Sequence, residues 1–130
     1  MIQEYVDRFM ANKSLLEIEF GKKHPDSYGD IVKAVIQVIT GDDYDDIDPE
    51  RIHEIDDGDY QGTLLFVIAS KAYQPSDYWS VFVSYGSCSH CDTLQSIRGW
   101  DLDEVPTADQ VSQYMTLALH IVQGLKKIGE

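Results

Sequence analysis

Two cysteines, a histidine and an aspartate lie close together in the segment Y-G-S-C-S-H-C-D, residues 85 to 92. These residue types bind zinc or exchange disulfides. Cys88 and Cys91 have C-x-x-C spacing, after a predicted strand and before T-L-Q-S-I-R, a predicted short helix with Asp92 or Thr93 as its N-cap. Backbone N–H groups and the positive end of a helix dipole favour the thiolate at such a corner. Metal binding and dithiol redox chemistry are therefore the two chemistries to test here.

Neither chemistry has its full set of partners in the sequence. Thioredoxin-like proteins place C-x-x-C before a long helix with further strands after it, and no strand pattern follows Gly99. A structural zinc site needs four ligands, and the other histidines have no recognisable ligand spacing: His24, His53 and His120. We therefore expect no cofactor, and a corner whose thiols pack as small apolar groups. A zinc or redox site at Cys88, Cys91 and His90 is kept as the alternative.

Acidic residues dominate the charge of the chain. The 130 residues include 23 Asp and Glu against 10 Lys and Arg, for a formal net charge of −13. Between Asp42 and Asp59 there are ten acidic residues and one basic residue, Arg51. Such a surface repels nucleic acids and anionic membranes, so we expect direct binding to neither. The segment has no register with the alternating acids, central glycine and final glutamate of a calcium loop.

Two interpretations of this acidic segment remain. It is a solvated loop, or it is a surface that binds a basic protein by imitating the phosphate spacing of a nucleic acid. We favour the second, with a basic, nucleic-acid-binding protein as the partner. The aspartates predicted to contact this partner are Asp42, Asp43, Asp45, Asp46, Asp48, Asp56, Asp57 and Asp59.

Catalytic signatures are missing from the sequence. It contains no G-x-S-x-G elbow, no H-E-x-x-H pair and no glycine-rich phosphate loop. His53 lies in a strand pattern without a nucleophile beside it. We therefore expect a binding protein without catalytic activity.

Helical patterns occur at both ends of the chain. Ile2 to Met10 has the spacing of one helical face, and Ser14 with Glu17 predicts a capping box for a second short helix that ends near residue 20. The segment I-V-K-A-V-I-Q-V-I-T, residues 31 to 40, predicts a buried helix capped by Ser27 and stopped by Gly41. Its β-branched residues leave a strand as the alternative. Thr107 and Gln110 predict a capping box for a long C-terminal helix.

The middle of the chain predicts three strands, at residues 51–57, 60–70 and 78–85. Residues 64 to 69 are apolar at every position, so this strand is expected to be central and covered on both faces. The third strand alternates and has one wetter face with Ser80 and Ser84. The expected fold is α+β: a three-stranded antiparallel meander packed by N-terminal helices and a long C-terminal helix, in one domain of residues 1–130.

The compartment is also predicted from the sequence. The first thirteen residues carry acids where a secretion signal has a basic head and an unbroken apolar stretch. Two cysteines are too few for a disulfide framework, which agrees with a reducing compartment. We expect a cytoplasmic protein without a membrane span; the patterns do not decide the oligomeric state.

Two stretches carry a resemblance, D-D-G-D-Y-Q-G-T-L-L-F-V-I and Y-W-S-V-F-V-S-Y-G-S-C-S-H-C-D-T-L-Q-S-I. They resemble the central segment of small uncharacterised phage and prophage proteins of Gram-positive bacteria, in which a strand ends in a Y-G-S-C-S-x-C-D corner. The resemblance covers about a third of the chain and assigns no functional residue. It implies a phage-encoded protein that binds and blocks a protein of the host, as an inhibitor of the anti-defence type.

Overall fold

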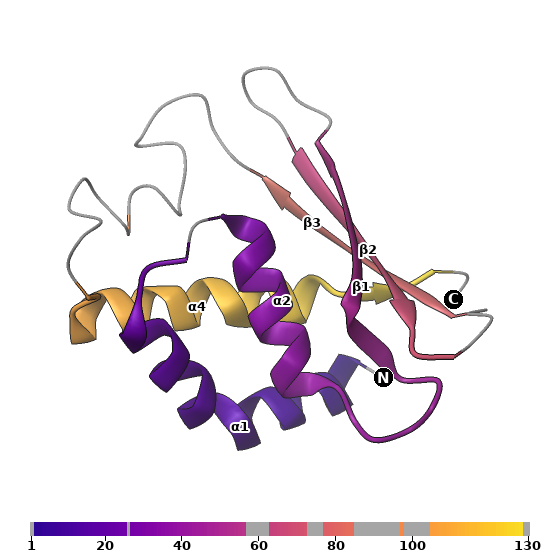
Figure 1. Ribbon diagram of the computed structural model, residues 1–130, viewed down its shortest axis with the longest axis horizontal. Helices are drawn as coiled ribbons and strands as arrows, with labels where there is room; N and C mark the ends of the chain where they lie inside the picture. Colours follow the sequence, from indigo (N-terminus) through magenta and orange to yellow (C-terminus); the bar gives the residue numbers. More distant parts are fainter. Residues whose placement is uncertain are drawn as a thin grey trace.

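A layer of helices packs against one face of an antiparallel sheet (Figure 1). The structure, a computed structural model, describes residues 2–25, 27–56, 63–72, 77–84, 97 and 105–128. The helices and strands follow in the order α1 (Ile2–Lys22), α2 (Tyr28–Ile39), β1 (Ile47–Asp56), β2 (Thr63–Ser70), β3 (Tyr78–Ser84), α4 (Ala108–Gly124) and β4 (Lys126–Lys127). The predicted α+β class and the antiparallel sheet are confirmed.

The sheet has four strands in the order β1-β2-β3-β4, and every neighbouring pair is antiparallel. The prediction of three strands is therefore wrong. The fourth strand, β4, consists of two residues that pair with Trp79 and Ser80 of β3. A two-residue strand is too short to show a periodicity, so no sequence pattern predicts it.

α1 is one continuous helix, and the predicted break at Ser14 is wrong. Its buried side chains, Tyr5, Phe9, Leu16 and Phe20, recur at intervals of four and seven residues along both halves. One apolar stripe therefore runs the length of the helix and packs against α2 and α4. This continuous stripe outweighs the local capping preference of Ser14.

The other two helices begin where the sequence predicts. The Ser27 hydroxyl accepts a hydrogen bond from the N–H of Asp30, which caps α2, and six side chains of this helix are buried. α2 ends with Thr40 as its C-cap, one residue before the predicted stop at Gly41. α4 has the predicted reciprocal capping box between Thr107 and Gln110 and is 17 residues long. None of the described helices is long and apolar enough to cross a membrane.

The two faces of the sheet differ in what covers them. On the inner face, residues such as Phe66 and Val81 are buried beneath the helices. On the outer face Val67 is only half-buried and Phe82 is exposed, and none of the described helices lies on that side (Figure 1). The prediction that β2 is covered on both faces is therefore wrong, because the described helices supply a covering layer on one side only.

Candidate functional site

The cysteine corner cannot be placed, because Cys88, His90 and Cys91 lie outside the described residues. The other histidines lie apart. His24 is buried with its Nδ1 hydrogen-bonded to the Tyr114 hydroxyl at 2.6 Å, whereas His53 on β1 and His120 on α4 are exposed. Across the part of the chain that the structure describes, no three His, Cys, Asp or Glu side chains gather as metal ligands.

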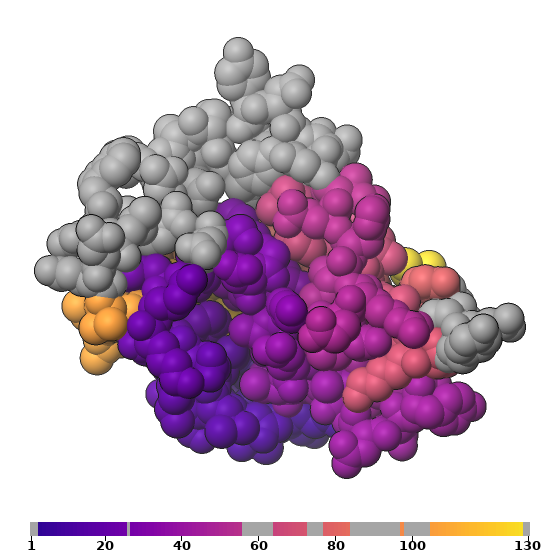
Figure 2. All heavy atoms as spheres, in the orientation of Figure 1, coloured from indigo at the N-terminus to yellow at the C-terminus, as the bar shows by residue number. Residues whose placement is uncertain are grey.

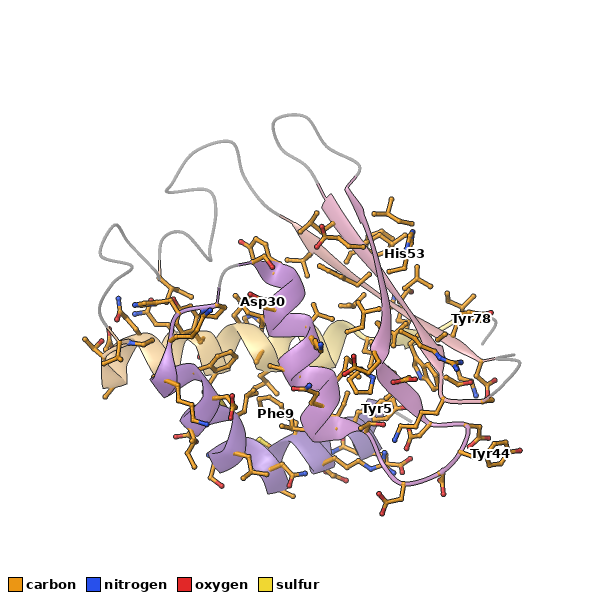
Figure 3. The ribbon with its side chains drawn as sticks, viewed as in Figure 1. Tyr5, Phe9, Asp30, Tyr44, His53 and Tyr78 are labelled. Carbon is orange, nitrogen blue, oxygen red and sulfur yellow. The ribbon has the colours of Figure 1, made fainter. Side chains whose placement is uncertain are left out.

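The predicted acidic surface divides into exposed and paired residues. Asp42, Asp43 and Asp45 are exposed in the loop of residues 40–46 between α2 and β1, here called the acidic loop. Figure 2 shows this loop projecting at the lower right of the molecule, and Figure 3 shows Tyr44 at its tip pointing away from the protein. These three carboxylates form no ion pair with any other described residue. They are free to meet a partner.

The remaining predicted aspartates lie elsewhere. Asp48 is the second residue of β1. Its Oδ1 accepts a hydrogen bond from the N–H of Glu50 at 2.9 Å, and its Oδ2 lies 3.3 Å from Nε of Arg51. Asp56 ends β1 opposite Leu64. The acidic segment is thus mostly a strand, not a loop. Asp57 and Asp59 lie outside the described residues.

Asp46 is a structural residue, with only 8% of its surface exposed. Its Oδ1 accepts from the N–H of Ile47 at 2.8 Å, and its Oδ2 accepts from the N–H of Gly41 at 2.9 Å and from Arg8 Nη1 at 3.0 Å. The Tyr5 hydroxyl donates to Oδ1 at 3.4 Å. Asp46 therefore holds both ends of the acidic loop and ties them to α1, so it cannot belong to the exposed contact surface.

This network determines the ionisation of its members. Burial alone would raise the pKa of Asp46, but the hydrogen bonds from Ile47, Arg8 and Gly41 outweigh it and hold the pKa of this carboxyl below its ordinary value. Burial raises the pKa of Tyr5, and the charge of Asp46 raises it further. Asp46 is thus a carboxylate, and Tyr5 a neutral donor, at physiological pH.

A small cleft of about 160 Å³ lies beside the acidic loop, between α1 and the sheet. Its lining combines five acidic, two basic and two aromatic side chains: Glu4, Asp43, Asp45, Asp46, Asp77, Arg8, Lys127, Tyr5 and Trp79. Arg8 pairs with Glu4 at 2.6 Å and with Asp46, and Lys127 pairs with Asp77 at 3.5 Å.

Of the acidic side chains that line the cleft, Asp43 and Asp45 form no ion pair with a described basic side chain. Behind them, Tyr5 and Trp79 meet edge to face with their centroids 6.4 Å apart. Both rings are buried, and Arg8 and Lys127 already lie 5.8 and 5.9 Å from the centroids of Tyr5 and Trp79. A cationic side chain that enters the cleft would therefore meet the unpaired carboxylates of Asp43 and Asp45.

Sequence reasoning identified the loop but not the rest of this site. Glu4 and Arg8 come from α1 and Asp77 from the residue before β3, far from the acidic loop in sequence. The spacing of Glu4 and Arg8, four residues apart, predicts a helix-surface ion pair and no more. Only the packing of α1 against the sheet brings these charges to the loop. Comparison of the chain with protein-family models, curated proteins and solved structures finds no match.

Proposed function

We propose that this chain is a small binding protein without catalytic activity of its own, and that its acidic loop docks on a basic, nucleic-acid-binding protein and blocks it. The observation that supports the proposal is that the aspartates of the loop have two different roles. Asp46 is buried and fixes the backbone, while Asp42, Asp43 and Asp45 project from it without ion pairs in the described structure.

The fixed backbone makes this loop suitable for binding. Ordering a flexible loop at an interface costs conformational free energy, and a loop that is already held avoids that cost. Exposed carboxylates attract a basic partner over about a Debye length, roughly 8 Å at physiological ionic strength. We therefore expect fast association that weakens steeply as salt is added.

The cleft adds a defined position for one basic side chain. An arginine of the partner would place its guanidinium near the exposed carboxylates of Asp43 and Asp45. A phosphate group would meet repulsion from the same carboxylates. The geometry thus favours a basic side chain over a nucleic acid as the occupant.

The biological setting is part of the proposal. The resemblance to phage and prophage proteins would make the partner a host protein and the site of action the host cytoplasm. Blocking a nucleic-acid-binding protein of the host would be an inhibitory, anti-defence activity. Nucleic acid would then compete for the same basic surface.

The test uses two variants with the same change in net charge. The loop variant carries Asp42→Asn, Asp43→Asn and Asp45→Asn. The control variant carries Glu17→Gln, Glu19→Gln and Asp109→Asn, at exposed positions on α1 and α4. Each immobilised protein is incubated with host lysate at low salt, and the retained proteins are eluted with a salt gradient.

We expect the parent and the control variant to retain a basic protein that the loop variant does not retain. A duplex oligonucleotide should displace the parent from this protein at low salt. Equal retention by the loop variant, retention of nothing by the parent, or no competition by the oligonucleotide would each contradict the proposal.

A further inference from the structure

The outer face of the sheet has an apolar centre. Ile55 of β1 lies opposite Leu65 of β2, and Leu65 lies opposite Phe82 of β3. Val67 and Tyr78 point to the same side, because residues on one face of a strand alternate. Phe82 is 67% exposed, Ile55 42% and Tyr78 38%. Exposed large apolar side chains that adjoin one another mark an interaction surface.

No described helix covers this face. α1, α2 and α4 all lie on the opposite side of the sheet, and Figure 3 shows His53 and Tyr78 pointing away from them. An apolar sheet face is ordinarily covered by a second layer. The outer sheet face, meaning the side of β1 to β3 that carries Ile55, Leu65, Val67, Phe82 and Tyr78, is therefore left uncovered by the described helices.

The charge of this face differs from the rest of the molecule. Between the apolar residues, the positions of this face that have an assigned strand partner hold His53, Ser80 and Lys126, and none of them is acidic. Near the start of β1, Asp48 is ion-paired with Arg51 at 3.3 Å. The chain as a whole has a net charge of −13. Two copies that met through surfaces rich in carboxylates would repel each other. The paired positions of the outer sheet face hold no carboxylate that would add to that repulsion, so this face suits contact with a second copy.

We propose that two copies of this chain pack their outer sheet faces against each other about a twofold axis. Such a contact is isologous, because the same residues serve on both sides. The two sheets would interdigitate their apolar side chains as the layers of a sandwich do, with Phe82 and Tyr78 as the largest groups buried. The acidic loop takes no part in this contact, so the proposal is independent of the proposed function.

The size of the face determines how strong the contact is. Three strands about 4.8 Å apart and seven residues at about 3.4 Å each give a footprint of roughly 340 Å² per copy. A standard interface buries about 800 Å² per partner. The dimer is therefore expected to be weak and reversible, with a Kd on the order of 10–100 µM.

Sedimentation velocity of the purified protein tests the proposal. From about 5 to about 500 µM, a range that brackets the expected Kd, the parent should shift from monomer to dimer. Added salt should strengthen the dimer, since it screens the repulsion between two negative chains. Phe82→Ser removes an apolar contact, and Lys126→Glu places a carboxylate on the face of both copies. Each should weaken dimerisation about tenfold or more.

The matched control is Ile18→Ser, at a side chain on α1 that is 57% exposed and lies on the helical side of the molecule. It should dimerise as the parent does. Thermal unfolding of each variant at low concentration checks the fold. If Phe82→Ser does not fold, Lys126→Glu decides, because residue 126 is exposed. A parent that stays monomeric throughout, or face variants that dimerise as strongly as Ile18→Ser, would overturn the proposal.

Discussion

Gly41 follows the C-terminal end of α2 and faces the carboxylate of Asp46. A Cβ built at residue 41 would lie 2.7 Å from Asp46 Oδ2 and 3.1 Å from Arg8 Nη2. Gly21, near the end of α1, has no atom within 4 Å of the same position. The two glycines therefore offer a pair of substitutions with opposite expected effects.

We predict that Gly41→Ala destabilises the protein by about 1–3 kcal/mol, since the methyl group displaces the ion pair that holds the acidic loop. Gly21→Ala should stabilise it by about 0.5–1 kcal/mol, because alanine loses less conformational entropy in a helix. Urea denaturation of dilute protein measures both. Equal stability of the two variants would show that the loop tolerates movement of Asp46.

Asp46 gives a prediction that depends on pH. Its folded-state pKa is lowered, so its carboxylate stabilises the fold fully above the unfolded-state value, about 3.9, and less as pH falls through the folded-state value. Asp46→Asn should therefore cost about 2–3 kcal/mol at about pH 7 and progressively less in acid. Urea denaturation across this pH range measures the difference. A cost that is the same at about pH 3 as at neutral pH would exclude the charge as its cause.

The sequence could not distinguish Asp46 from its neighbours. Asp45 and Asp46 are identical residues in the same acidic run, and no local pattern separates them. What separates them is Arg8 on α1, far away in the chain, together with the N–H groups of Gly41 and Ile47. The location of the acidic surface could be predicted from composition. The structural role of Asp46 could be recognised only from the tertiary fold.

β2 and β3 carry two phenylalanines on opposite faces of the same sheet. Phe66 is fully buried beneath the helices, and Phe82 is exposed on the outer sheet face. Phe66→Ala should cost about 3–5 kcal/mol through lost burial and the cavity left behind. Phe82→Ala should cost less than about 1 kcal/mol in dilute monomeric protein. Denaturant unfolding of both variants gives the comparison; similar losses would mean that the outer face is covered in solution.

Local signals explain which elements could be predicted. Ser27 and Thr107 cap helices because each lies directly before an apolar helical pattern and is not itself inside another helix. Ser14 has the same preference but lies within the stripe of α1, where burial of Leu16 and Phe20 dominates. β2 is apolar on both faces in sequence, and composition cannot tell a covered face from one left for a partner.

At the scale of the molecule, charge and apolar surface are separated. The acidic loop precedes β1, and the positions of the outer sheet face that have an assigned strand partner hold no carboxylate. A chain with net charge −13 must keep its acids apart from any surface on which copies meet. Composition predicts the total charge, but only the strand register shows that the centre of one face holds no acidic residue.

The acidic loop also determines how the stability of the whole molecule depends on salt. Three unpaired aspartates within four residues repel one another and the rest of the negative chain. Raising NaCl from about 0.05 to about 0.5 M shortens the Debye length from roughly 14 to 4 Å, so the melting temperature of dilute parent protein should rise. The variant with Asn at positions 42, 43 and 45 should be more stable at low salt, by no more than about 1 kcal/mol, and should gain less from added salt.

The charge-matched variant Glu17→Gln, Glu19→Gln and Asp109→Asn has the same net charge but loses more dispersed acids and the Glu19–Lys22 pair, so its salt dependence should stay closer to that of the parent. Thermal unfolding at several salt concentrations measures all three. If the two variants respond to salt alike, the repulsion belongs to the net charge of the molecule and is not concentrated in the loop.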